Sequence, residues 1–209
     1  MRILAIDTST AAASSAIVEN GSLLCDFTIN DGKKHSEKLI NIVNIALENS
    51  GMDINDIDAF ACSIGPGSFT GLRLGAAAVK GFGQALNKPV IAVPTLDALA
   101  YNVYPCSGLI CPILDAQRNM VYSSLYMTKD NELRKLEDYR AIGIDELIEK
   151  LGKFDERIIM LGDGMPIFGE KLKKALPNII ESSPGTLYPR ASSVALLAEK
   201  FYKEGKALR

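Results

Sequence analysis

Two aspartates that each follow an apolar run are the strongest candidates for chemistry in this sequence. Asp7 opens a turn with Thr8 and Ser9, and Asp115 opens a polar turn in the second half of the chain. A third apolar run ends in Gly162-Asp163-Gly164. Carboxylates and hydroxyls at strand ends are able to hold Mg²⁺ and nucleotide phosphates. Aspartates also hold ordinary turns by accepting hydrogen bonds from nearby backbone, and for Asp7 we favour this second interpretation.

A glycine-rich loop, Gly65-Pro66-Gly67-Ser68, precedes a predicted helix and offers a second candidate for phosphate binding. Backbone N–H groups at a helix N-terminus bind anions. The loop lacks the Gly-Lys-Ser/Thr sequence of a P-loop, and Lys80 lies too far along the helix to replace that lysine. Phosphate binding by this loop alone is therefore the less favoured interpretation.

His35 is the single histidine, which excludes any site built from several histidines. A conventional Ser-His-Asp protease would need His35 as its base, but this residue opens a predicted helix and joins its apolar arc. We expect a capping or interface role for it. The four cysteines show no CxxC spacing, so we expect free, buried thiols in a reducing cytoplasm.

The composition is that of a globular protein able to bury a core. Of its 209 residues 47% are hydrophobic, and 23 basic against 25 acidic residues give a net charge of -2. This balance argues against a dedicated nucleic-acid binder, which normally carries a basic excess. The sequence shows neither a signal peptide nor a membrane span. We expect a cytoplasmic protein with no membrane partner.

Hydrophobic periodicity predicts the elements that carry these residues. In the first half we expect strands at 3–6, 15–19, 23–29, 59–64 and 89–93, with helices at 35–50 and 71–86. In the second half we expect strands at 109–114, 120–126, 133–139 and 158–161, with helices at 144–151, 165–175 and 191–203. Both halves open with strand, aspartate turn and strand, which indicates a duplicated βββαβα unit.

The repeat predicts an α/β protein with two lobes. We expect an N-terminal lobe at 1–100 and a C-terminal lobe at 101–189, with a hinge near 94–108, where prolines and glycines interrupt the pattern. The last helix, within 190–209, is expected to pack back on the N-terminal lobe. The arrangement resembles the fold of actin, sugar kinases and heat-shock ATPases, in which hairpin loops face phosphates.

The predicted helix 71–86 contains four glycines, which cost it about 3–4 kcal/mol relative to alanine. Small residues fill one arc of its helical wheel. The small residues permit either tight packing inside the protein, which their spacing alone favours, or close approach of a helix from a partner protein. Helix 35–50 has a broader apolar arc than a single sheet would cover, and this favours contact with a partner protein. We therefore predict a partner interface from these two helices, comprising His35, Leu39, Ile42, Val43, Ala46, Gly71, Leu72, Gly75, Ala78, Val79 and Phe82.

The segment GPGSFTGLRLG, together with ILAIDTST and KKHSEKL, resembles the bacterial TsaB family, also called YeaZ. The family motif loop comprises Gly65, Pro66, Gly67, Ser68, Phe69, Thr70, Gly71, Leu72 and Arg73. The resemblance implies a non-catalytic subunit of the machinery that places threonylcarbamoyl on the tRNA adenosine next to the anticodon. It implies heterodimerisation with the catalytic paralogue TsaD, a larger complex with the ATPase TsaE, a homodimer when alone, and tRNA contact only through the complex.

The paralogue also provides a residue-level test of catalysis. TsaD carries a His-x-x-x-His metal motif, and the matching positions here are Thr95 and Leu99. Its third ligand is an aspartate, where this chain has Ala191-Ser192-Ser193. We therefore expect no catalytic residues, no metal and no cofactor on this subunit, with ATP and a metal on TsaD. Asp7, Thr8, Ser9 and Asp115 would form at most a vestigial nucleotide site.

Two other functions remain open from the residues alone. One is a free-standing ATPase or small-molecule kinase that uses Asp7, Thr8 and Asp115 around a nucleotide. The other is a glycoprotein endopeptidase, which would need a nucleophile–base pair or a metal.

Overall fold

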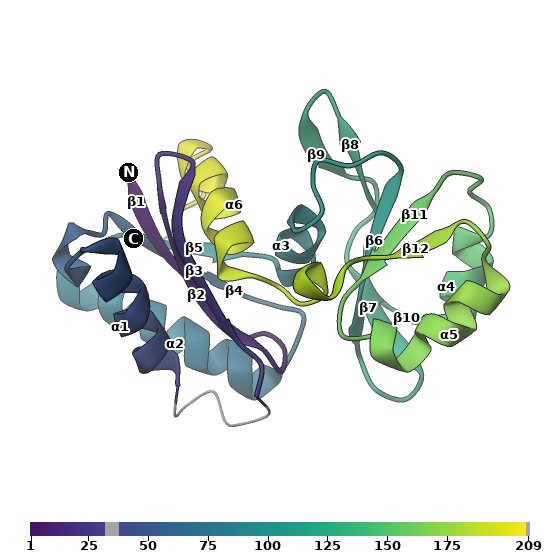
Figure 1. Ribbon diagram of the computed structural model, residues 1–209, viewed down its shortest axis with the longest axis horizontal. Helices are drawn as coiled ribbons and strands as arrows, with labels where there is room; N and C mark the ends of the chain where they lie inside the picture. The colour runs from purple at the N-terminus through teal and green to yellow at the C-terminus, as the bar shows by residue number, and fades with distance from the viewer. Residues whose placement is uncertain (32–37, 208–209) are drawn as a thin grey trace. The chain divides into compact units, whose positions relative to one another are not determined.

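The computed structural model describes residues 1–31 and 38–207 (Figure 1). The chain divides into two compact units. The first comprises Met1–Ala98 and Pro189–Arg209, and the second comprises Leu99–Tyr188. In the described part of the chain, no helix has the length and apolar character needed to cross a membrane.

The first unit is a five-stranded sheet covered by helices on both faces (Figure 1). Its strand order is β3-β2-β1-β4-β5, where β1 runs antiparallel to β2 and parallel to β4. Helices α1 and α2 cover one face, and α6 packs on the other against β1 and β2. The bounds are β1 Arg2–Asp7, β2 Ala13–Glu19, β3 Ser22–Ile29, β4 Ala59–Ser63, β5 Val90–Val93, α1 Leu39–Ser50, η2 Ile54–Asp56, α2 Phe69–Leu86 and α6 Ala191–Lys203.

The second unit repeats this topology. Its sheet has the order β10-β7-β6-β11-β12, with β8 paired to β6 and β9. Strand β6 runs antiparallel to β7 and parallel to β11, as β1 does with β2 and β4. The bounds are α3 Thr95–Tyr101 at the unit boundary, then β6 Leu109–Asp115, β7 Met120–Ser123, β8 Tyr126–Lys129, β9 Glu132–Lys135, β10 Arg140–Gly143, α4 Ile144–Leu151, β11 Ile158–Leu161, α5 Met165–Ala175, β12 Ile179–Glu181 and η3 Pro184–Thr186.

The structure confirms the α/β class and corrects several elements. Helix α2 begins at Phe69, because the Ser68 hydroxyl accepts a hydrogen bond from the Gly71 N–H and caps it there. The predicted strand 120–126 is two strands, because β7 pairs with β10 while β8 pairs with β9. Helix α3 lies within the predicted hinge 94–108, and the short strands β10 and β12 were missed.

Candidate functional site

The turn after β1 is held by its own aspartate. The Asp7 side chain is buried, and its carboxylate accepts hydrogen bonds from the Ser9 N–H at 3.0 Å and the Ser9 hydroxyl at 2.9 Å. The Ser63 hydroxyl, at the end of β4, donates a further short hydrogen bond to Asp7. Asp7 therefore stabilises the junction of two neighbouring parallel strands. Ser63 was missed in the sequence, although it is the polar residue near the end of an apolar run.

The family motif loop lies directly against this turn. The Ser68 N–H donates to the carbonyl of Ser9 at 2.7 Å, and the Thr8 hydroxyl donates to the carbonyl of Gly71 at 2.7 Å. The loop and the first turn of α2 are thus hydrogen-bonded to the backbone and side chains of the Asp7 turn. Phosphate binding would require groups such as the N–H of Ser68 and the hydroxyl of Thr8. Both already form hydrogen bonds within the protein.

The glycines of the motif permit this close approach. A Cβ at Gly71 would overlap the carbonyl oxygen of Thr8, and one at Gly67 would overlap the carbonyl oxygen of Ser9. At Gly75 it would lie 2.6 Å from the Thr8 hydroxyl. Backbone packing at this distance admits only glycine. The helix-propensity cost of these residues is therefore offset by packing of α2 inside its own unit.

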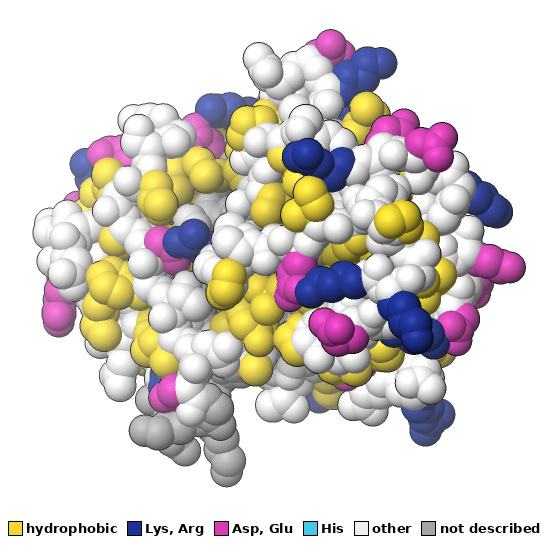
Figure 2. Space-filling model, turned by 45° about the vertical axis from the view of Figure 1, so that its right-hand side comes forward, with side chains coloured by type: hydrophobic (Ala, Val, Ile, Leu, Met, Phe, Trp, Pro, Cys, Tyr) yellow, Lys and Arg dark blue, Asp and Glu magenta, His cyan; other side chains and the backbone are white. Residues whose placement is uncertain are grey.

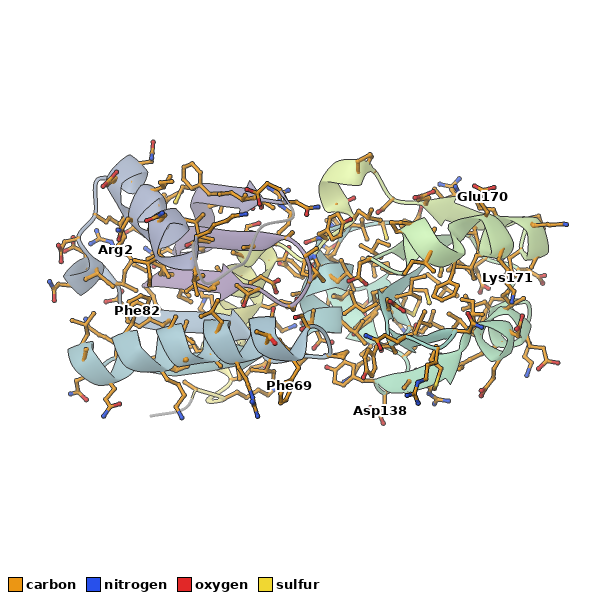
Figure 3. All side chains as sticks on the ribbon, turned by 90° about the horizontal axis from the view of Figure 1, so that it is seen from below. Arg2, Phe69, Phe82, Asp138, Glu170 and Lys171 are labelled. Atoms are coloured by element: carbon orange, nitrogen blue, oxygen red, sulfur yellow. The ribbon has the colours of Figure 1, made fainter. Side chains whose placement is uncertain are left out.

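This packing corrects the predicted partner face of α2. Gly71 and Gly75 are buried against Thr8, and Val79 is fully buried in the core. Ala78 and Phe82 pack against the same core, where the Phe82 ring lies 5.4 Å from that of Phe60 (Figure 3). Leu72, also in the prediction, is half-buried. The first part of the small-residue arc, at Gly71 and Gly75, therefore packs inside its own unit. The exposed part of the arc begins at Gly81, where a Cβ would meet nothing within 4 Å.

The predicted partner residues of α1 are likewise in the core. Leu39, Ile42, Val43 and Ala46 are at most 2% exposed, because they face the sheet. His35 lies outside the described residues. The side chains that α1 exposes are different ones, including Ile40 at 52% and Ile45 at 36%.

We define the outer helix surface as the side of α1 and α2 that faces away from the sheet. In Figure 3, Phe69 projects from this side of α2, and it is 67% exposed. Exposed large apolar side chains at two neighbouring helices are typical of a protein-binding surface. The exposed residues of this surface are Ile40, Asn41, Asn44, Ile45, Glu48 and Asn49 on α1, and Phe69, Thr70, Arg73, Ala77, Lys80, Gly81, Gln84 and Ala85 on α2.

The positions that match the metal motif of the catalytic paralogue serve structural roles. Thr95 is fully buried, and its hydroxyl accepts a hydrogen bond from the Gly65 N–H at 3.1 Å. Leu99 is fully buried and carries no donor atom for a metal. At the start of α6, the Ser192 hydroxyl donates to Asp26. These residues do not fit a transition-metal site. Within residues 1–31 and 38–207, no three or more His, Cys, Asp and Glu side chains are grouped to hold a metal.

The aspartate turn of the second unit is built like that of the first. The Asp115 carboxylate accepts a hydrogen bond from the Gln117 N–H at 2.9 Å, two residues along, as Asp7 does from Ser9. The Asp163 carboxylate accepts from the Asp115 N–H at 2.9 Å. Burial raises the pKa of Asp163, and the neighbouring charge of Asp115 raises it further.

Two of the four cysteines are excluded as nucleophiles by their burial. All four thiols are free, as predicted, and Cys62 and Cys111 are buried, whereas Cys25 and Cys106 are only half-buried, which corrects the expectation that all four are buried. Burial raises the pKa of Cys62 to about 12, with the Asp7 charge contributing, and burial raises that of Cys111 to about 12 as well. The thiolate is the reactive form of cysteine, so these two side chains are inert at neutral pH.

Comparison with known proteins identifies relatives over the whole chain. The family model of TsaD, tRNA N6-adenosine threonylcarbamoyltransferase, matches residues 23–207. A tRNA threonylcarbamoyladenosine biosynthesis protein TsaB from Bacillus subtilis is 30% identical, over 96% of this chain and 88% of the relative. The protein of the same name from Escherichia coli is 28% identical, over 100% of this chain and 90% of the relative.

Solved structures agree with this relationship. YeaZ from Pseudomonas aeruginosa superposes with a TM-score of 0.83 at 25% identity, covering 100% of this chain and 95% of that one. A ROK hexokinase from Thermus thermophilus, at 11% identity, has a TM-score of 0.54 and shows the kinase-like fold alone. The two-lobed fold class predicted from the sequence is thus confirmed. The chain belongs to the family of the tRNA threonylcarbamoyladenosine biosynthesis proteins TsaB, also called YeaZ.

Proposed function

We propose that this chain is a non-catalytic subunit in the biosynthesis of threonylcarbamoyladenosine in tRNA, and that it acts by binding the catalytic paralogue TsaD and making it competent. The observation that carries the proposal is the burial of Thr95 and Leu99 and their lack of metal-binding groups. Both are buried, and neither supplies a metal ligand at a position where the catalytic paralogue carries histidine. Threonylcarbamoyl transfer with a metal that holds the substrate would therefore require another subunit to supply the metal site.

The Asp7 turn supports the same proposal over a free-standing ATPase or kinase. A nucleotide site on this turn would need a carboxylate and hydroxyls directed at the metal and the phosphates. Here the Asp7 carboxylate accepts hydrogen bonds from Ser9 and Ser63, and the Thr8 hydroxyl donates to Gly71. We therefore assign ATP and the metal to the catalytic subunit.

The outer helix surface is the proposed contact with TsaD. Ile40, Ile45 and Phe69 supply exposed apolar area, while the buried faces of α1 and α2 fix both helices on the sheet. On the one face that Figure 2 shows, Lys and Arg side chains are interspersed with Asp and Glu. Over the whole sequence 23 basic residues stand against 25 acidic ones, so the chain lacks the basic excess of a dedicated tRNA-binding protein. We therefore propose that tRNA is reached through the complex, which also recruits the ATPase TsaE in the cytoplasm.

Size-exclusion chromatography of purified proteins tests the pairing. We expect this chain and TsaD of the same organism to elute together as one complex, and this chain alone to hydrolyse no ATP. A complex that buries a protein–protein interface of standard size is stable enough for the two chains to elute together. Separate elution at micromolar concentrations, or ATP turnover by the isolated chain that Asp7→Ala abolishes, would instead support the kinase alternative.

A further inference from the structure

A small pocket lies in the second unit, between β7, β10 and the end of α4. Its inner wall is made of buried apolar side chains, whereas its outer part is polar. The polar residues are Ser123, Ser124, Glu137, Arg140 and Lys150. Small-molecule sites typically combine apolar walls with a few polar groups that converge. The pocket is therefore a candidate binding site.

The pocket contains two cations and one carboxylate. The Lys150 ammonium forms an ion pair with the Glu137 carboxylate, and each of these side chains is 23% exposed. Arg140 lines the same pocket, and among the residues that the structure describes no Asp or Glu forms an ion pair with it. Charge interactions are stronger at such half-buried positions than in open water, because the surrounding dielectric constant is lower. The pocket therefore favours an anion.

Ser123 adds a buried hydroxyl without a short hydrogen bond. It is 3% exposed, and its hydroxyl lies 3.4 Å from the carbonyl of Ser124 and 3.3 Å from the sulfur of Cys111. Hydrogen bonds between oxygens are normally about 2.5–3.0 Å long, and a buried polar group without a strong partner indicates a bound water or ion. Ser123 and Arg140 are paired across β7 and β10, so their side chains lie on the same face of the sheet.

The backbone of Glu137 is held in place, whereas its side chain is able to rotate into solvent. The Ser124 hydroxyl donates to the Glu137 carbonyl at 2.6 Å, and the Leu136 N–H donates to the Leu125 carbonyl at 2.7 Å. The enclosed space beside the Glu137 carboxylate is about that of one water molecule. A carboxylate ligand therefore enters only when the Glu137 side chain leaves, and it then takes the place of a group of its own chemistry.

We propose that Arg140, Lys150 and Ser123 form a binding site for a small carboxylate ligand, and that the Glu137 side chain occupies this site when the ligand is absent. The ligand's carboxylate accepts hydrogen bonds from both cations, and such charge-assisted bonds are stronger than neutral ones. Its short apolar part contacts the inner wall at Leu147. Propionate is the matching probe, because it has the structure of a glutamate side chain.

Titration of the isotope-labelled chain with sodium propionate at low salt, followed by NMR, tests the site. We expect shifts confined to β7, β10 and α4, with a dissociation constant of about 10 mM, in the range open to so small a ligand. Glu137→Gln removes the competing charge and should tighten binding about tenfold. Adding Lys150→Met to this variant leaves no lone charge from the ion pair and should weaken binding at least about tenfold. Lys174→Met, at an exposed lysine of α5, is the matched control and should bind like the wild type.

Arg140→Gln changes an exposed side chain, so the chain should stay folded and bind propionate about threefold more weakly. Propionamide, the neutral isostere of propionic acid, should cause no shifts. Equal binding of propionate and propionamide would show an apolar space without charge recognition and would overturn the proposal. Absence of propionate binding to a folded Glu137→Gln chain, or equal binding with and without Lys150→Met, would overturn it as well. Unchanged binding by Arg140→Gln would contradict the part assigned to that residue.

Discussion

Gly71→Ala should lower the free energy of unfolding of the first unit by about 2–3 kcal/mol, whereas Gly81→Ala should raise it by about 0.5–1 kcal/mol. The added methyl group at Gly71 overlaps the carbonyl oxygen of Thr8, which is backbone and unable to rotate away. The start of α2 must then move off the Asp7 turn, with loss of its hydrogen bonds to Ser9 and Thr8. At Gly81 the methyl group meets nothing within 4 Å, so only the gain in helix propensity remains.

Urea unfolding followed by circular dichroism measures both variants. They make the same chemical change in the same helix, so they separate close packing from helix propensity. Equal effects of the two substitutions, in either direction, would show that α2 does not pack against the Asp7 turn as described.

Gly81→Arg should abolish the TsaD complex at micromolar concentrations while the chain stays folded. Gly81 is exposed on α2, and arginine is a better helix former than glycine, so the isolated chain gains stability. In a complex that uses the outer helix surface, the long side chain would hold the partner's backbone away and bury a charge. A loss of about 4 kcal/mol is a factor of about a thousand in the dissociation constant.

Gly185→Arg is the matched control for this variant. Gly185 is exposed in the second unit, and a Cβ there also meets nothing within 4 Å. Chromatography with TsaD and thermal melting are measured on both variants. Retention of the complex by a folded Gly81→Arg protein would remove α2 from the proposed interface.

The sequence predicted the fold well because its signals are local. Apolar runs and the strand-end aspartates depend on neighbouring residues, and the duplicated topology follows from their order. Between β2 and β3, Asn20 and Gly21 both adopt the positive φ angles that a two-residue hairpin turn requires. The short strands β10 and β12 carried too few residues for periodicity to reveal them.

The candidate site was harder to predict because it depends on tertiary contacts. The spacing of Gly71 and Gly75 indicates a small-residue face but does not say what it contacts, and the contact is Thr8, more than sixty residues earlier. The predicted apolar arc of α1 likewise included Ile42 and Val43, which are buried, as well as Ile40, which is exposed. A helical wheel separates polar from apolar positions, whereas the depth of each apolar position depends on the sheet beneath it.

Reconstitution of tRNA modification by omission tests the central claim most directly. Purified TsaD, TsaE and this chain are incubated with unmodified tRNA, ATP and the threonylcarbamoyl donor, and modified adenosine is measured by mass spectrometry of the digested tRNA. We expect product only when this chain and TsaD are both present, and none from this chain without TsaD. Product formed at the full rate without this chain, or by this chain in the absence of TsaD, would contradict the account.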